Sequence, residues 1–171
     1  MAREFYELIK AYAQARPDHP AIIDGDSAVT YRELLEQIET FVSALDSLDL
    51  NPDSKLGILC MNQKEYLVAF LGALHKGLPF IPLNYMLTPD DLGFIAQDAG
   101  IDTILTDSTF IKPGCSALFK QFKNKIFVAG EGSVEPMGEG ALSFDAFMQR
   151  GDRGKKSPKR AIEHFINFAK I

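Results

Sequence analysis

Apolar residues recur at helical spacing in the first part of the chain. Between residues 3 and 15 they lie three or four positions apart, which predicts a helix that ends before Pro17. A second stripe follows Thr30, and its members are Leu34, Leu35, Ile38, Phe41, Val42 and Leu45. Thr30 and Glu33 have the spacing of a capping box, so a long helix is expected to begin there. Residues 21–30 between the two helices predict a hairpin, whose turn is Asp24-Gly25-Asp26.

Short apolar runs alternate with helical patterns from residue 55 to residue 129. The expected strands are 55–60, 78–83, 103–106 and 125–129. The expected helices are 64–76, a segment that begins at Thr88-Pro89 and stops at Gly100, and 115–122. Strands that alternate with helices are typical of a parallel sheet with right-handed crossovers. The predicted fold class is therefore α/β, with a mostly parallel sheet and helices on both faces.

The character of the sequence changes after residue 130. A glycine-rich stretch is followed by an expected short helix at 144–148, and residues 163–168 alternate enough to be a strand. We therefore predict three parts: an N-terminal α/β subdomain (1–130), a glycine-rich and basic connection (131–160) and a final strand (161–171).

The charge of the chain is unevenly distributed. The net charge of −5 gives no general bias toward nucleic acid or an anionic membrane. Residues 150–160, however, hold six basic residues and one acidic residue. A solvated loop is the favoured interpretation, and a loop that faces a phosphate or a partner is the alternative.

The cysteines and the apolar runs indicate a cytoplasmic protein. The two cysteines form neither a disulfide framework nor a zinc pattern; Cys60 is expected to be buried, and Cys115, which follows Pro-Gly, to be exposed. The N-terminus lacks the features of a secretory signal. The longest apolar run, residues 66–74, is shorter than the roughly 20 residues that span a bilayer.

The sequence contains no constellation of residues that would carry chemistry. Phosphate-binding glycine loops, nucleophile elbows and zinc-binding helix motifs do not occur in it. The isolated histidines are interpreted as structural; they are His19, His75 and His164. Asp90 and Asp91 are expected to face a helix dipole rather than a metal, and the glycines after residue 129 are interpreted as a linker. We therefore assign no catalytic, cofactor-binding or metal-binding residue.

Three segments resemble the adenylate-forming (AMP-binding) superfamily. Residues 29–34, VTYREL, resemble its (L/V)-T-Y-x-E-L box. Residues 71–84, LGALHKGLPFIPLN, resemble its x-A-x-x-(K/R)-A-G-x-x-x-x-P-L-(N/D) segment, and Leu87–Leu92 resembles its T-P-x-E-L helix start. The resemblance covers residues 5–110 well and residues 111–171 loosely. It implies an incomplete N-terminal portion of the fold, in which these segments are scaffold.

The resemblance implies a fragment of an acyl-CoA synthetase, such as a fatty-acid–CoA ligase. Such enzymes form an acyl-adenylate and then a thioester with CoA, so ATP, magnesium and CoA are expected for the full-length family but none is expected to bind this chain. Asn84 after Pro-Leu favours acyl-CoA ligases over amino-acid-activating domains, whereas Met86 stands where the family often has arginine. Residues 165–168 resemble the strand that leads into the family's phosphate loop, but only Ala169-Lys170-Ile171 follows. We therefore expect this polypeptide to be inactive alone.

Three alternatives remain open at this stage. The chain could be a non-catalytic assembly module that complements a separate C-terminal part, a fragment of an amino-acid adenylation domain, or an unrelated α/β protein. The expected partners are the missing C-terminal part or a second copy that associates through an exposed sheet.

Overall fold

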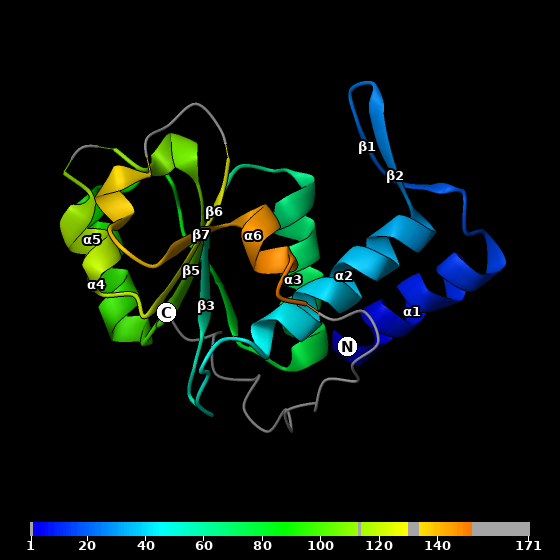
Figure 1. Ribbon diagram of the computed structural model, residues 1–171, viewed down its shortest axis with the longest axis horizontal. Helices are drawn as coiled ribbons and strands as arrows, with labels where there is room; N and C mark the ends of the chain where they lie inside the picture. Colours follow the sequence, from blue (N-terminus) through cyan, green and yellow to red (C-terminus); the bar gives the residue numbers. More distant parts are fainter. Residues whose placement is uncertain (1, 113, 130–133, 152–171) are drawn as a thin grey trace.

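A parallel five-stranded sheet forms the centre of the molecule in the computed structural model, which describes residues 2–112, 114–129 and 134–151 (Figure 1). Its strands are β3 (Leu56–Leu59), β4 (Phe80–Pro82), β5 (Thr103–Asp107), β6 (Asn124–Val128) and β7 (Ala141–Ser143). Their order across the sheet is β4-β3-β5-β6-β7, and every neighbouring pair is parallel.

The two central strands are buried on both faces. Every residue of β3 and of β5 is buried, as expected for a sheet that is covered on both sides. Because successive side chains point to opposite faces, Leu105 packs into one hydrophobic core and Ile104 into the other. The same alternation places Ile58 in the first core and Leu59 in the second.

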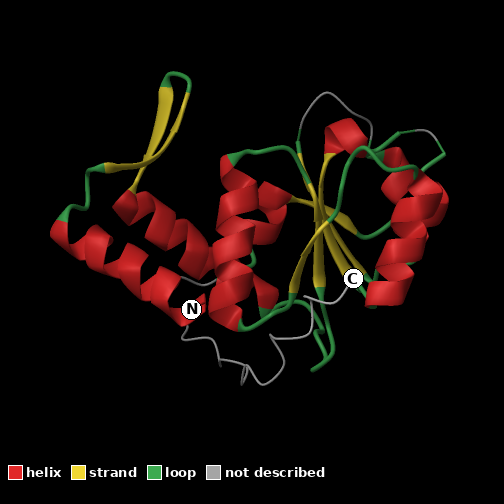
Figure 2. Ribbon diagram, turned by 180° about the vertical axis from the view of Figure 1, so that it is seen from behind, coloured by secondary structure: helices red, strands yellow, loops and turns green. Residues whose placement is uncertain are grey.

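Helices cover each face of the sheet (Figure 2). The first core lies against α2 (Tyr31–Leu45), α3 (Lys64–Lys76) and α6 (Phe144–Met148). The second lies against α4 (Pro89–Ala99), α5 (Ser116–Lys120) and the 3₁₀ turns η1 (Ser108–Phe110) and η2 (Glu135–Met137). The predicted α/β class, with helices on both faces of a parallel sheet, is confirmed. Among the described residues, no helix is long and apolar enough to cross a membrane.

Local signals set the helix ends where the sequence predicts them. The Thr30 side chain accepts a hydrogen bond from the Glu33 amide, and the Glu33 carboxylate accepts one from the Thr30 amide at 2.8 Å, which completes the capping box. The Thr88 side chain accepts a hydrogen bond from the Asp91 amide and so caps α4, with Pro89 in the first turn. Gly77 and Gly100 end α3 and α4 with φ of 75° and 68°, a conformation that favours glycine.

The N-terminal segment packs beside the sheet domain and ends in a projecting hairpin. Helix α1 (Ala2–Ala15) lies against α2 and α3 and buries Tyr6, whose hydroxyl donates to Glu39 at 2.8 Å. Strands β1 (Pro20–Asp24) and β2 (Ser27–Thr30) form the predicted antiparallel hairpin. The turn centres on Gly25, whose φ is 56°, followed by Asp26. Figure 1 shows the hairpin extending away from the rest of the molecule.

Some expectations differ from the structure or lie outside it. Strand β7 was not predicted, and it pairs with β6 as the outer strand of the sheet. The prediction that Cys115 is exposed is wrong: it is 4% exposed, because the turn before α5 folds it into the second core. The basic run from residue 152 onward and the expected strand at 163–168 lie outside the described residues. The division at residues 130 and 160 stays a prediction.

Candidate functional site

The carboxyl ends of the parallel strands meet along one edge of the sheet. The chain leaves β3 toward α3 on the first core and leaves the adjacent β5 toward α5 on the second core. Neighbouring strands whose connections diverge in this way form a topological switch point, beside which open α/β sheets place their ligand sites. We therefore take the segments that follow β3, β4 and β5 as the candidate site.

A hydrogen-bond network joins the segments that follow β3 and β5. The side-chain Nε2 of Gln63 donates to Asp107 Oδ2 at 3.3 Å. Asp107 Oδ1 accepts from the Thr109 amide at 2.8 Å and from the Thr109 hydroxyl at 2.6 Å. Asp107 is buried, so these donors replace the water that its carboxylate loses. The network holds both segments in fixed positions.

Cys60 lies at the same edge but is not suited to nucleophilic chemistry. Burial, together with the negative charge of Asp107, raises the pKa of the Cys60 thiol to about 12. Its Sγ points to the carbonyl oxygen of Leu105 at 3.8 Å. The thiol is therefore protonated at neutral pH, whereas the nucleophile and metal ligand is the thiolate. The predicted burial of Cys60 is confirmed.

Ser108 carries a buried hydroxyl at this edge. The residue is 1% exposed, and within the described part of the chain its Oγ has no hydrogen-bond partner. A buried hydroxyl without a hydrogen-bond partner lowers the free energy of unfolding. In native structures such groups are found at strained or catalytic positions or beside a bound water or ion.

The outer rim of the edge is apolar. Met61 follows β3, and Tyr85 and Met86 follow β4; all three side chains are exposed. Tyr85 stacks on Phe110 after β5, with ring centroids 5.3 Å apart. The Asn84 side chain accepts a hydrogen bond from the Met86 amide at 3.0 Å and so fixes the turn that presents both rim residues. The site thus has a polar interior and an apolar border.

Two hollows separate the hairpin from the first turn of α3. Their volumes are about 220 and 260 Å³, and Ile22, Asp24, Gln63 and Lys64 line both. Because Gln63 also bonds Asp107, these hollows adjoin the network at the sheet edge.

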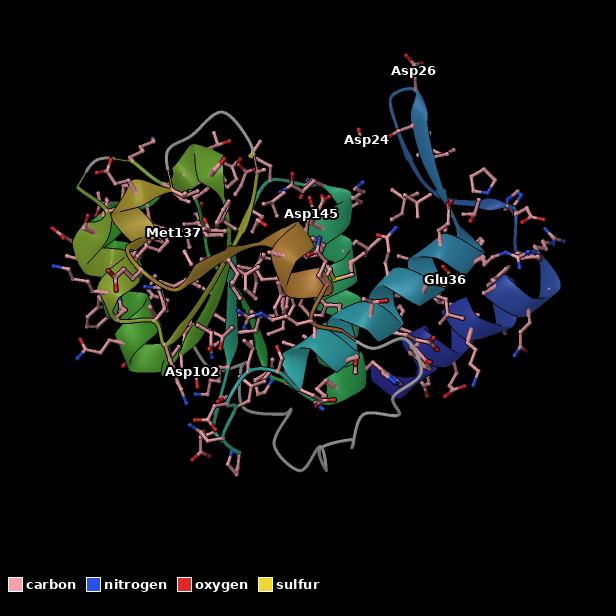
Figure 3. All side chains as sticks on the ribbon, viewed as in Figure 1. Asp24, Asp26, Glu36, Asp102, Met137 and Asp145 are labelled. Atoms are coloured by element: carbon pink, nitrogen blue, oxygen red, sulfur yellow. The ribbon has the colours of Figure 1, made fainter. Side chains whose placement is uncertain are left out.

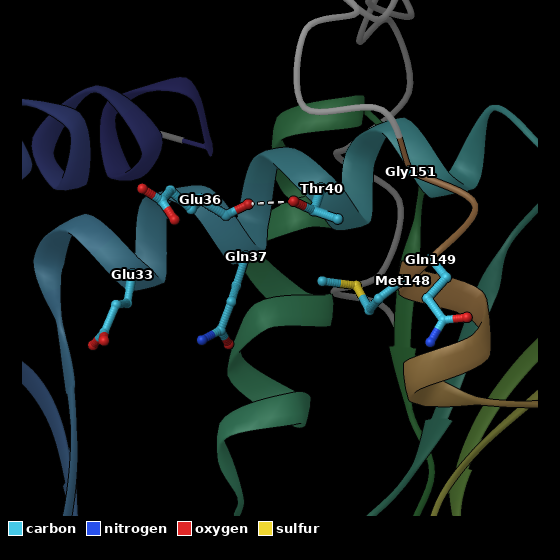
Figure 4. Close-up of a pocket in the computed structure, with 7 residues that line it drawn as sticks. All are labelled: Glu33, Glu36, Gln37, Thr40, Met148, Gln149 and Gly151. Atoms are coloured by element: carbon cyan, nitrogen blue, oxygen red, sulfur yellow. Dashed lines mark hydrogen bonds between the residues drawn. The ribbon is translucent and has the colours of Figure 1, made fainter.

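A third hollow, of about 460 Å³, lies between α2 and α6 (Figure 4). Its lining residues are Glu33, Glu36, Gln37, Thr40, Met148, Gln149 and Gly151. The Thr40 hydroxyl donates to the backbone oxygen of Glu36 at 2.7 Å and belongs to the helix rather than to a ligand site. Carboxylates on one wall disfavour the binding of phosphate at this position.

The residues that the sequence analysis examined have structural surroundings. His75 stacks on Tyr6 with centroids 3.6 Å apart, and His19 lies over Tyr31 at 6.3 Å. Asp91 accepts from the Thr88 hydroxyl at 2.7 Å in the cap of α4. His164 lies outside the described residues, as do Gly130 and Gly132.

The carboxylates of the molecule are dispersed. Figure 3 shows Asp24 and Asp26 together on the hairpin, well apart from Glu36 on α2, Asp102 before β5 and Asp145 on α6. Within residues 2–112, 114–129 and 134–151, no three His, Cys, Asp or Glu side chains group in a way that could hold a metal ion. The assignment of no site residues stays a prediction. The Gln63–Asp107 contact was not predicted, because its only signals in the sequence are a polar residue before α3 and another at the end of β5.

Comparison with known proteins gives one family and two kinds of relative. Residues 9–157 match the model of the AMP-binding enzyme family. The chain is 30% identical over 111 residues to surfactin synthase subunit 1 of Bacillus subtilis (strain 168); this match covers 65% of the chain and 3% of that protein.

The solved structures that share the fold include two CoA ligases. A benzoate CoA ligase from Burkholderia xenovorans LB400 has a TM-score of 0.71 and 22% identity over 86% of the chain and 28% of its own length. The anthranilate CoA ligase AuaEII in complex with anthranoyl-AMP has a TM-score of 0.72 and 19% identity over 91% of the chain and 29% of its own length. The chain therefore spans less than a third of these two structures and a few per cent of the synthase.

Proposed function

Because the chain belongs to the AMP-binding enzyme family, we propose that it is the N-terminal scaffold of an enzyme that activates a carboxylic acid as an acyl-adenylate. The observation that carries this proposal is the match over residues 9–157, which includes the whole described sheet.

The surroundings of the family-like segments support a scaffold role. Thr30 and Glu33 form a cap, Thr88 forms another, and Gly77 ends a helix. All four residues begin or end helices. The Cys60 thiol at the sheet edge is protonated because burial raises its pKa. The groups that stabilise developing charge on a transferring phosphate therefore have to come from elsewhere in such an enzyme.

A more specific proposal is an acyl-CoA ligase. Asn84 supports it through the resemblance alone, in which asparagine at this position favours acyl-CoA ligases. The hydrogen bond to the Met86 amide does not distinguish asparagine from aspartate, because an aspartate could accept it as well. Solved structures that share this fold include a benzoate CoA ligase and an anthranilate CoA ligase, which is consistent with this proposal. In this proposal the product is a thioester of CoA. The proposed location is the cytoplasm, whose reducing conditions keep thiols such as Cys60 and Cys115 free.

ATP–pyrophosphate exchange tests the proposal. Two polypeptides are compared with a panel of fatty acids, aromatic acids and amino acids: the 171-residue chain and the polypeptide encoded by the whole reading frame. We expect no exchange by the 171-residue chain, since its sequence has no glycine-and-hydroxyl phosphate loop, and exchange by the whole polypeptide with at least one acid. Exchange by the 171-residue chain alone would refute the scaffold role. No exchange by the whole polypeptide with any acid would refute carboxylate activation.

The second candidate is a segment of an amino-acid adenylation domain, and the 30% identity to surfactin synthase subunit 1 favours it. The same panel separates the candidates. Fatty or aromatic acids that yield a CoA thioester support the acyl-CoA ligase. Exchange restricted to amino acids, without thioester formation on CoA, supports the second candidate.

A further inference from the structure

The hollow of about 460 Å³ between α2 and α6 is negatively charged (Figure 4). It is called the α2–α6 hollow here. The described residues that line it include two carboxylates, those of Glu33 and Glu36, and no basic side chain. The exposed Glu33 is ionised at neutral pH, because hydrogen bonds from Thr30 hold its pKa below the ordinary value. A hollow with this charge favours a cationic occupant.

The chain leads directly from this hollow into its most basic segment. Gly151 lines the hollow, and residues 152–160, called the basic segment here, follow it. Five of these nine residues are basic and one is acidic, in a chain whose net charge is −5. The basic segment lies outside the described residues, but the position from which it departs is described.

Gly151 is fixed against α2. A Cβ at this position would clash with the backbone oxygen of Thr40 and would lie 3.2 Å from that of Met148. The Gly151 amide also donates to the Met148 carbonyl oxygen at 3.0 Å. Thr40 and Glu36 are four residues apart and therefore neighbours on the surface of α2. The basic segment thus begins about one helical turn from Glu36.

Covalent geometry keeps the basic side chains within reach of the hollow. A chain extends by at most about 3.6 Å per residue, so the Cα atom of Arg153 is within about 7 Å of Gly151, and that of Lys156 within about 18 Å. A tether this short gives an effective concentration in the millimolar range, which favours this segment over cations in solution and over a second copy. Met148, which is only partly buried, offers apolar surface to the methylene groups of a lysine.

We propose that the basic segment docks in the α2–α6 hollow and forms ion pairs with the carboxylates of α2. The docked segment covers the hollow and holds α6 against α2, in addition to the packing of Phe144 and Phe147 on Phe41. The positive charge that would attract an anionic partner is then neutralised within the chain itself.

Disulfide formation between two introduced cysteines tests the docking. In the 171-residue chain, Gln37→Cys places a thiol in the hollow and Ser157→Cys places one in the basic segment. Cys60 and Cys115 are buried and contribute little background. The rate at which oxidised glutathione links positions 37 and 157 within one chain is measured, and this doubly substituted chain is the reference.

Reversing charge on either side should slow the reaction. Glu36→Lys in the reference is expected to reduce the rate about fivefold, because several weak ion pairs are lost together. Lys155→Glu with Lys156→Glu should also reduce it, and joining these two changes to Glu36→Lys should restore much of the rate. Asp98→Lys is the matched control and should leave the rate unchanged, because the exposed Asp98 lies on α4, over the other face of the sheet.

The two reversals keep the test independent of folding defects. The change at residues 155 and 156 alters no described residue, so slowing by this variant cannot come from damage to α2. Equal rates in the reference and in both reversals would overturn the proposal, since the two thiols would then meet only through random motion of the tether. Disulfides that form between chains and increase with concentration would identify a second copy as the occupant and would also overturn it.

Discussion

At the scale of single residues, Gly72 decides how closely α2 and α3 approach. A Cβ at this position would lie 2.6 Å from Cδ1 of Phe41 on α2. Phe41 is fully buried and packs against Phe144 and Phe147 of α6, with centroids 6.1 and 5.4 Å away, so its ring has little room to move. The absence of a side chain at residue 72 therefore fixes the thickness of the helical layer over the first core.

Gly72→Ala is expected to lower the free energy of unfolding by about 1–3 kcal/mol, because overpacking outweighs the gain in helix propensity. Gly93→Ala in α4 is the matched control. The nearest atom to its Cβ would be Gln121 Nε2 at 3.5 Å, so this variant should be neutral or more stable by up to about 1 kcal/mol. Urea unfolding of both variants checks the difference, and equal effects at the two glycines would contradict it.

At the scale of elements, the ends of helices could be predicted and the outer strand could not. The residues that end these helices act on the backbone within a few positions of themselves, so the local sequence predicts their effect; they are Thr30, Gly77, Thr88 and Gly100. Strand β7 has only three residues after a glycine-rich stretch, and it is a strand because β6 lies beside it. The candidate site could not be predicted for the same reason: Gln63 and Asp107 are 44 residues apart and meet only in the folded sheet.

The cap of α2 makes stability depend on pH. Hydrogen bonds from the Thr30 amide and then the Thr30 hydroxyl hold the pKa of Glu33 below its ordinary value. A carboxylate with a lowered folded pKa stabilises the fold above its unfolded pKa, and this contribution is lost as pH falls through the folded pKa. Glu33→Gln should therefore lower the urea midpoint at pH 7, and the difference from the unchanged chain should shrink in acid. A difference that is constant from pH 7 to acid would contradict this assignment.

At the scale of the whole molecule, the two cores share the strands that separate them. Leu105 and Ile104 are neighbours in β5 and belong to opposite cores. A substitution that destabilises one core is therefore expected to destabilise the other through the strand they share. Tyr6 and Tyr66 report on the first core, where Tyr6 is buried and Tyr66 packs against the cluster. Tyr85 stacks on Phe110 beside the second core, so the measurement uses a Tyr85→Phe background that removes its signal.

Ile104→Ala should cost about 2–5 kcal/mol by opening a cavity in the second core. We expect tyrosine fluorescence and far-ultraviolet circular dichroism to report one common transition, shifted by the same amount. An unshifted tyrosine signal beside a shifted dichroism signal would show instead that the two cores unfold separately.

The order of the strands also bears on how the chain is made. Strand β3 pairs on one side with β4 and on the other with β5, where Leu56 lies opposite Phe80 and Thr103 respectively. On the ribosome, β3 and β4 can associate across α3 while the second side of β3 is still open. That open side remains a site for wrong pairing between nascent chains until β5 has been synthesised. Because the strand of this sheet that is synthesised first lies in the interior of the sheet, we expect the chain to fold slowly after synthesis without a loss of final stability.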